Sequence, residues 1–164
     1  INMIYEGTNT VQSLDLLGRK VVMNEGAALA AMGRVVQATM AQAQGSATLA
    51  PMAQALQHAW HDVMDSVQAL RPRLRSEGEA VLANAHLFLE AFGHTVLAWT
   101  WLRQAVVALR ALDAGGDATD EAFYRGKLQA ARWFFRWELP KVTAQLALLR
   151  TMDDSHLAMR DEWF

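Results

Sequence analysis

The stretch from Ile4 to Gln12 holds the residues whose types and order could do chemistry: a carboxylate, a glycine and a hydroxyl follow one another at Glu6, Gly7 and Thr8. A carboxylate partly removed from water has a raised pKa and can act as a general base. Gly7 lacks a Cβ, so the backbone can approach a ligand closely. A helix start directly after these residues would favour a phosphate or a developing enolate. The same residues also suit an ordinary helix cap, so their types alone leave both interpretations open.

The elements that must position these residues are expected to be helices. Ala, Leu, Gln, Arg and Met are abundant, proline and glycine are scarce over long stretches, and no alternating run of β-branched residues suggests a strand. Helical segments are predicted at about 9–23, 27–44, 51–70, 77–112 and 119–151, with one short helix in the tail at 153–164.

The boundaries of these segments have local signals. Thr8 or Asn9 could cap the first helix, and Thr119 is expected to cap the fifth. Pro140 should kink the fifth helix near residues 136–139, because proline donates no backbone hydrogen bond. The connections are short, which favours antiparallel neighbours and predicts an all-α, up-down antiparallel helical bundle. A composition shift at Gly18–Gly26 separates the first helix from the rest.

Composition excludes several classes of protein. The chain has 164 residues, 52% hydrophobic and 20% charged, with a formal net charge of -2 and no cysteine. We therefore expect no nucleic-acid binding, no disulfide or thiolate metal site, and no membrane span. A cytoplasmic location fits these features. The chain carries no signal peptide and does not start with Met, so we interpret it as a piece of a longer protein.

The stretch Ile4-Tyr5-Glu6-Gly7-Thr8-Asn9-Thr10-Val11-Gln12 resembles the Y-E-G-T-x-x-[IV]-Q signature of acyl-CoA dehydrogenases. Residues 13–20, 93–99, 123–128 and 134–140 resemble the long bacterial subgroup with an extra helical C-terminal domain, one branch of which acts on 3-methylmercaptopropionyl-CoA. The resemblance implies that residues 1–25 end the catalytic C-terminal domain and residues 26–164 form the extra helical bundle.

The resemblance also implies roles for individual residues. Glu6 matches the glutamate that removes the α-proton of an acyl-CoA thioester, a step in fatty-acid metabolism, while a hydride passes from the β-carbon to FAD. Gly7, Thr8 and Thr10 match positions that contact FAD, although Thr10 stands where other members have Gln or Gly. Acyl-CoA, an electron-transferring flavoprotein and further copies of the same chain are the implied partners. Preceding domains build most of the FAD and substrate pockets, so this chain alone is expected to hold no FAD stably and to be inactive.

Three side chains of the fourth predicted helix share one face: His86, Glu90 and His94, spaced four residues apart. The apolar stripe assigned to the core lies roughly opposite and consists of Val81, Ala85, Phe88, Phe92, Val96, Trp99 and Val106. The His–Glu face could pack against another helix or subunit, lie in solvent, or bind a metal. We favour packing and assign no metal ligand.

Other clusters have simpler interpretations. His58 and His61 flank Trp60 without a nucleophile at suitable spacing, so a catalytic triad is not expected. The segment 132–138 mixes arginines with aromatic residues and is interpreted as a buried helix, with contact to a nucleotide as an alternative. The arginines at 71, 73 and 75 fit a solvated turn or a phosphate contact. Two other functions stay open: a bundle that only mediates assembly, and a free-standing α-helical interaction module without a catalytic role.

Overall fold

The computed structural model describes residues 8–115 and 117–164, and within these ranges the chain forms helices and no strand. This confirms the predicted all-α fold. None of the described helices is both long and apolar enough to cross a membrane. The elements in chain order are α2 (Asn9–Asp15), η1 (Leu16–Lys20), η2 (Met23–Gly26), α3 (Ala27–Gln44), α4 (Ala50–Leu70), η3 (Arg71–Leu74), α5 (Gly78–Ala83), α6 (Ala85–Ala114), α7 (Ala118–Trp137), α8 (Lys141–Thr151) and η4 (Asp161–Trp163).

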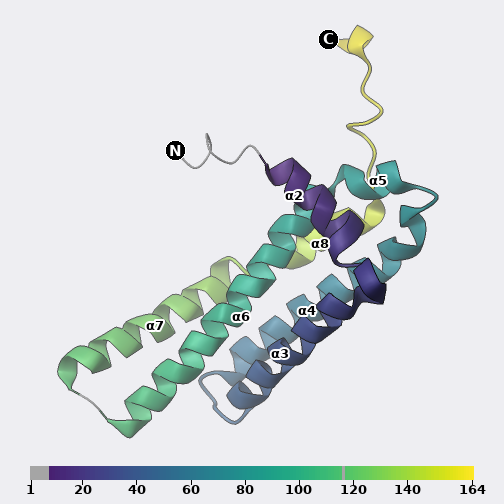
Figure 1. The fold of residues 1–164 in the computed structure, drawn as a ribbon. Helices are drawn as coiled ribbons and strands as arrows, with labels where there is room; N and C mark the ends of the chain where they lie inside the picture. Colours follow the sequence, from purple (N-terminus) through teal and green to yellow (C-terminus); the bar gives the residue numbers. More distant parts are fainter. Residues whose placement is uncertain (1–7, 116) are drawn as a thin grey trace.

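The long helix α6 is the centre of the bundle. It contacts α2, α3, α4, α7 and α8, and Figure 1 shows α7 along one side of it and the α3–α4 pair along the other. The α3–α4 pair and the α6–α7 pair are each joined by a short connection and run antiparallel, as short connections require. The segment after α8 extends away from the bundle at the same end as α2.

The buried face of α6 alternates steps of three and four residues, which keeps one side of a helix turned inward. The side chains on this line are fully buried: Phe88, Ala91, Thr95, Ala98, Leu102 and Ala105. The stripe predicted from the sequence is therefore only partly correct. Four of its members are buried as expected: Val81, Ala85, Phe88 and Val106. Phe92, Val96 and Trp99 are only half-buried, because the inward line passes through small alanines instead.

The predicted fourth helix is not continuous. It is interrupted at Asn84, whose backbone (φ −107°, ψ 23°) leaves the helical region and separates α5 from α6. The Asn84 side chain is buried, and its Nδ2 donates a 2.7 Å hydrogen bond to the backbone oxygen of Asp153. The break lets α5 contact η1 and η3 while Asn84 fixes the chain that leaves α8.

Helix α7 begins one residue earlier than predicted, and Asp117 rather than Thr119 caps it. Asp117 Oδ1 accepts hydrogen bonds from the backbone N–H groups of Thr119 and Asp120, both at 2.9 Å. A carboxylate at this position satisfies two free donors and lies at the positive end of the helix dipole.

Replacing Asp117 with alanine should lower the free energy of unfolding by about 1 kcal/mol, because the two backbone donors lose their acceptor. Urea titration followed by circular dichroism measures this change. Asp113→Ala, at the other side of the same connection, is the matched control and should change stability much less. Equal losses in the two variants would show that the cap contributes nothing specific.

Pro140 does more than kink the predicted fifth helix. Helix α7 ends at Trp137 and α8 begins at Lys141, with Pro140 at the N-cap position of α8. A missing N–H costs little at the start of a helix, so the chain ends one helix and starts another there. The two helices therefore contact α6 separately, at different levels along its length.

The predicted first helix also changes character along its length. After Asp15 the hydrogen bonds widen to a π-helical turn over Leu16–Lys20, and the α-helix does not resume until Ala27. Asn24, Glu25 and Gly26 all have positive φ (49°, 57° and 82°), which forms a left-handed turn. Such a conformation costs roughly 1–2 kcal/mol per non-glycine residue, so surrounding packing must hold it. This turn joins α2 and η1, together called the first segment below, to the bundle that starts at α3.

Candidate functional site

The start of α2 carries the described part of the predicted site. Thr8 occupies the N-cap position, and its carbonyl accepts a 2.8 Å hydrogen bond from the backbone N–H of Gln12. Its hydroxyl accepts a 2.9 Å hydrogen bond from Gln12 Nε2 and makes no side-chain cap. Thr8 is therefore the capping position, but the expected side-chain cap does not form.

Thr10 lies in the first turn of α2, and its side chain is exposed. The backbone oxygen of Thr10 accepts a 2.8 Å hydrogen bond from the hydroxyl of Ser13, which is almost fully buried. This bond and the contacts of α2 with α6 fix the position of the turn. Glu6 and Gly7, the predicted base and its neighbour, lie outside the described residues.

The apolar side chains of α2 and η1 divide between core and surface. Leu17 is buried at 1% exposure, whereas Val11 and Leu14 are 66% and 40% exposed. Two exposed aliphatic side chains on one short helix form a surface that other protein could cover.

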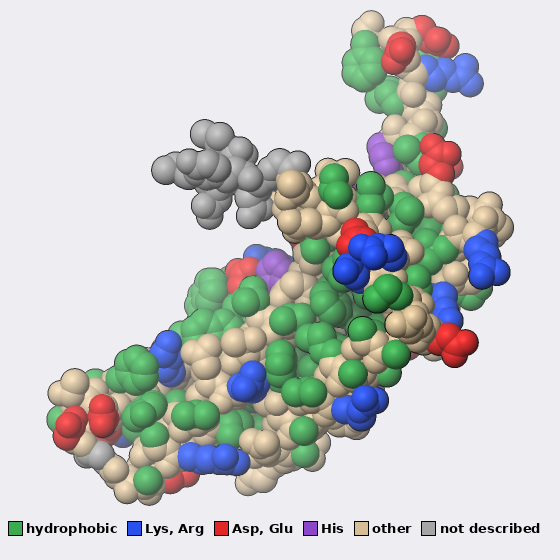
Figure 2. All heavy atoms as spheres, in the orientation of Figure 1, with side chains coloured by type: hydrophobic (Ala, Val, Ile, Leu, Met, Phe, Trp, Pro, Cys, Tyr) green, Lys and Arg blue, Asp and Glu red, His purple; other side chains and the backbone are tan. Residues whose placement is uncertain are grey.

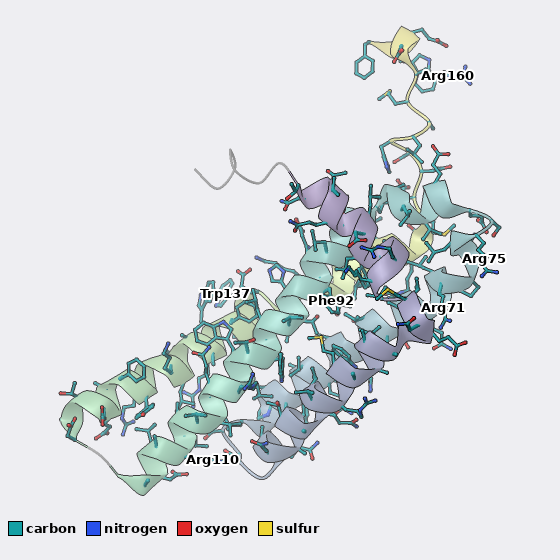
Figure 3. All side chains as sticks on the ribbon, viewed as in Figure 1. Arg71, Arg75, Phe92, Arg110, Trp137 and Arg160 are labelled. Atoms are coloured by element: carbon teal, nitrogen blue, oxygen red, sulfur yellow. The ribbon has the colours of Figure 1, made fainter. Side chains whose placement is uncertain are left out.

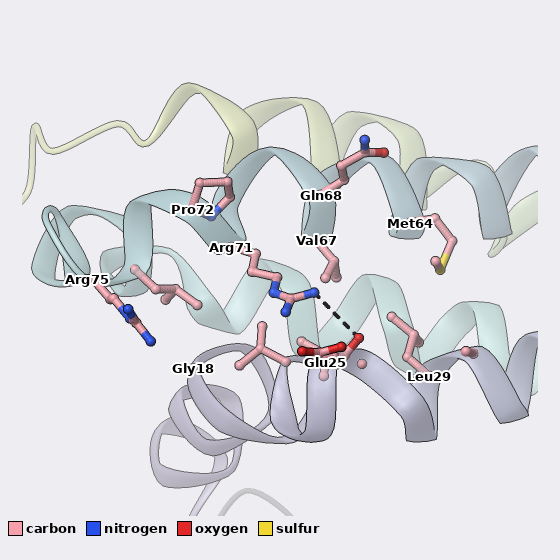
Figure 4. A pocket seen from close by; sticks show the side chains of 14 residues that line it. Gly18, Glu25, Leu29, Met64, Val67, Gln68, Arg71, Pro72 and Arg75 are labelled. Atoms are coloured by element: carbon pink, nitrogen blue, oxygen red, sulfur yellow. Dashed lines mark hydrogen bonds between the residues drawn. The ribbon is translucent and has the colours of Figure 1, made fainter.

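A groove of about 1050 Å³ lies where the first segment meets α4 and η3. Figure 4 shows Arg71 directed across it, with the Arg71 guanidinium donating a long 3.5 Å hydrogen bond to the backbone oxygen of Glu25. Arg75 lines the same groove, whereas Arg73 pairs with Glu77 at 2.7 Å. The three arginines predicted as a solvated turn are all exposed, and Arg71 spans the junction of the first segment with the bundle.

Gly18 lies at a close approach in this junction. A Cβ built at Gly18 would lie 3.3 Å from a methyl carbon of Leu82 on α5. A Cβ at this position would require the Leu82 side chain to shift by a few tenths of an ångström, so η1 and the Leu82 side chain pack closely here.

The His–Glu face of α6 packs against α7 and α8 within the same chain. Glu90 accepts a 2.8 Å hydrogen bond from Gln145 of α8. His94 Nε2 lies 3.4 Å from Glu138 Oε2, and the His94 ring stacks on Phe134 with 6.1 Å between centroids. His86 is exposed. Among the residues that the structure describes, no group of three His, Cys, Asp or Glu side chains could hold a metal ion.

Glu138 connects this cluster to the start of α8. The hydrogen bond from Lys141, at 2.7 Å, is the main reason that the pKa of Glu138 lies below its ordinary value near 4.5, and His94 contributes further. A carboxyl whose pKa is lower in the folded state adds stability that is present above the unfolded pKa and is lost as pH falls through the folded pKa.

We therefore expect Glu138→Gln to flatten the acid side of the stability profile. Below about pH 4.5 the difference between wild type and variant should shrink, because the wild-type carboxyl becomes protonated as well. Chemical unfolding between pH 3 and pH 7, in roughly one-unit steps, measures it. Glu79→Gln, on exposed α5 surface, is the control, and a constant difference at every pH would contradict the expectation.

The aromatic segment of α7 does not lie wholly in the core. Phe134 and Phe135 are buried, but Trp133 and Trp137 are 53% and 64% exposed, and Figure 3 shows Trp137 at the end of α7 near α6. The interpretation of 132–138 as a buried helix is therefore correct for the two phenylalanines and wrong for the two tryptophans. Phe134 faces His94 and Trp101 of α6, and the tryptophans lie on the exposed side of α7.

His58 and His61 are exposed on α4. Sequence reasoning missed a second groove, of about 660 Å³, between α3, α6 and α7. Its floor carries Arg103 and Arg110, whose seven-residue spacing on one helix face was the signal that could have indicated it.

Residues 24–160 match the family described as acetyl-CoA dehydrogenase C-terminal like. The whole chain aligns with the broad-specificity linear acyl-CoA dehydrogenase FadE5 of Mycobacterium tuberculosis at 30% identity, and the alignment covers 28% of that protein's length. It also aligns with butyryl-CoA dehydrogenase of Syntrophomonas wolfei at 27% identity, over 27% of that protein's length. A third alignment is with 3-methylmercaptopropionyl-CoA dehydrogenase of Ruegeria pomeroyi, at 28% identity. It covers 94% of this chain and 26% of the relative.

The chain thus spans little more than a quarter of the length of these relatives. The matched family region covers α3 to α8, the whole helical bundle described above. The chain belongs to the acyl-CoA dehydrogenase family and corresponds to its acetyl-CoA dehydrogenase C-terminal-like region.

Proposed function

We propose that this chain is the C-terminal part of an FAD-dependent acyl-CoA dehydrogenase and that Glu6 is its catalytic base. The observation that carries the proposal is the family match over residues 24–160, joined to the Tyr5-Glu6-Gly7-Thr8 motif ahead of it. The relatives share dehydrogenation of acyl-CoA in their names but differ in the acyl group. The proposed substrate is therefore an acyl-CoA thioester, and the proposal does not specify its acyl group.

The proposed reaction removes two hydrogens from neighbouring carbons. Glu6 takes the α-proton of the thioester, and FAD supplies the hydride acceptor for the β-hydrogen, so an α,β-double bond forms. The electrons then pass to an electron-transferring flavoprotein. Donors close to the thioester oxygen stabilise the enolate-like charge, and the backbone N–H of Glu6 is the proposed one in this chain.

The described residues fit a role at the edge of a cofactor site. Thr8 and Thr10 present hydroxyls at the start of a helix, where free N–H groups favour a negatively charged ligand. Both side chains are exposed, and neither lines the grooves of about 1050 Å³ and 660 Å³ described above. Together with the exposed Val11 and Leu14, this supports a site completed by protein outside the chain. We propose that Gly7, Thr8 and Thr10 contact FAD from one side.

The remainder of the chain has a structural role in this proposal. Residues 1–25 would belong to the catalytic domain and residues 26–164 to the extra bundle, with the left-handed turn at Asn24–Gly26 near their boundary. The start of the family match at residue 24 supports this division. The bundle would contribute to assembly of a homo-oligomer. A helical interaction module without catalytic role is the competing function.

Flavin content tests the proposal. The purified 164-residue chain mixed with FAD should show no flavin absorbance after gel filtration, whereas the longer protein containing it should retain flavin, because most of the pocket is supplied by other domains. Stable flavin in the 164-residue chain would contradict the division of the site. Absence of flavin from the longer protein would favour the interaction module instead.

A further inference from the structure

The groove between α3, α6 and α7 is positively charged. Arg103 and Arg110 come from α6 and Lys127 comes from α7, and no carboxylate lies among the described residues that line it. Figure 2 shows Lys and Arg side chains spread over the face that these helices form, and Figure 3 shows Arg110 near the lower end of α6. This concentration of positive charge contrasts with a chain whose formal net charge is -2.

Each of the three cations is held by neutral groups. The Arg103 guanidinium lies 5.0 Å from the centre of the Trp99 ring, and Trp99 Nε1 donates a 2.9 Å hydrogen bond to Thr39 of α3. Lys127 Nζ lies 5.9 Å from the Trp101 ring and 5.3 Å from the Phe123 ring.

Arg110 donates a long 3.5 Å hydrogen bond to Gln42 Oε1. Within residues 8–115 and 117–164, none of the three cations makes an ion pair. The aromatic and amide partners fix positions without cancelling charge, so the positive charge remains available to an anion.

The spacing of these charges suits more than one phosphate. Seven residues along a helix correspond to about 10 Å, so Arg103 and Arg110 mark the two ends of the charged floor, and Lys127 faces it from α7. Guanidinium groups bind phosphate oxygens through paired N–H donors, and no carboxylate among the described lining residues competes for them.

The groove also offers a surface for a flat ring. Phe123, one of the residues that line the groove, is 58% exposed. The centres of the Phe123 and Tyr124 rings lie 5.4 Å apart in an edge-on arrangement. Gln104 adds an amide that can donate and accept hydrogen bonds. A volume of about 660 Å³ lies within the range of small-molecule sites.

We propose that this groove binds a nucleoside diphosphate, with the phosphates on Arg103, Arg110 and Lys127 and the base against Phe123. The inference adds a second ligand site to the chain and does not depend on the base assigned to Glu6 or on a bound flavin. The ligand would sit on α6, whose contacts extend to every major helix of the bundle.

The test is isothermal titration of the 164-residue chain with ADP at low salt. We expect saturable binding with a Kd below about 1 mM, weakened by added salt because exposed charges carry it. Arg103→Gln, Arg110→Gln and Lys127→Gln should each weaken binding at least about threefold. Arg132→Gln removes an exposed cation of α7 outside the groove and should leave binding unchanged.

The ring is tested separately with inorganic pyrophosphate and with Phe123→Ser. Pyrophosphate should bind more weakly than ADP to the wild-type chain, and Phe123→Ser should remove that difference. Equal binding of the two ligands to wild type would overturn the assignment of a nucleotide. Weakening by Arg132→Gln equal to that of the groove variants would overturn the site. The absence of saturable ADP binding to a wild-type chain that keeps its helical spectrum would also overturn it.

Discussion

Glu6→Gln in the longer enzyme that contains this chain should lower turnover by about 10²–10⁴-fold while FAD stays bound. Glutamine keeps the size and shape of glutamate but cannot accept the α-proton of the thioester. The flavin contacts proposed for Gly7, Thr8 and Thr10 do not involve that carboxylate, so cofactor content should not change. Steady-state turnover with an acyl-CoA and the flavin absorbance of the same sample measure the two effects.

A matched control separates loss of the base from a general effect of the substitution. Glu25→Gln makes the same chemical change at an exposed residue of the left-handed turn and should retain wild-type turnover. Anaerobic mixing with substrate should show flavin reduction slowed in Glu6→Gln by the same factor as turnover, if proton removal limits both. Wild-type rates in Glu6→Gln would mean that another residue removes the proton.

Phe88→Ala should lower the free energy of unfolding of the 164-residue chain by about 3–5 kcal/mol. Phe88 is fully buried on α6 and stacks on Phe92, with 5.8 Å between ring centroids. Removing the ring loses buried apolar surface and leaves a cavity in the core beside α6. Every major helix of the bundle contacts α6. Urea unfolding followed by circular dichroism gives the change at constant temperature.

Phe123→Ala is the control for this substitution, because the same atoms are removed from a side chain that is 58% exposed. Its effect on stability should stay within about 0.5 kcal/mol. A loss at Phe88 no larger than the loss at Phe123 would contradict the placement of Phe88 at the centre of the core.

Local signals in the sequence predicted most of the helices. The helix bounds at 27–44 and 51–70 agree with α3 and, within one residue, with α4, because glycine, serine and proline mark their ends. Pro140 was correctly taken as an interruption of the fifth helix, since its effect on backbone hydrogen bonding is local. The motif around Glu6 identified the family, and Thr8 and Thr10 lie at the start of a helix as predicted.

The errors concern features that depend on distant residues. Asn84 interrupts a helix whose composition is uniformly helical, and its side chain binds the backbone of Asp153 across the fold. Trp133 and Trp137 were assigned to the core because helical periodicity cannot tell which of two apolar faces another helix will cover.

The sequence by itself determined the helical class, most helix ends and the family, because capping, proline geometry and the Glu-Gly-Thr motif act within a few residues. Only the tertiary structure decided which face of α6 is buried and which charges meet. Arg103, Arg110 and Lys127 come from two helices, and their groove exists only because α3 and α7 both pack against α6 and flank it.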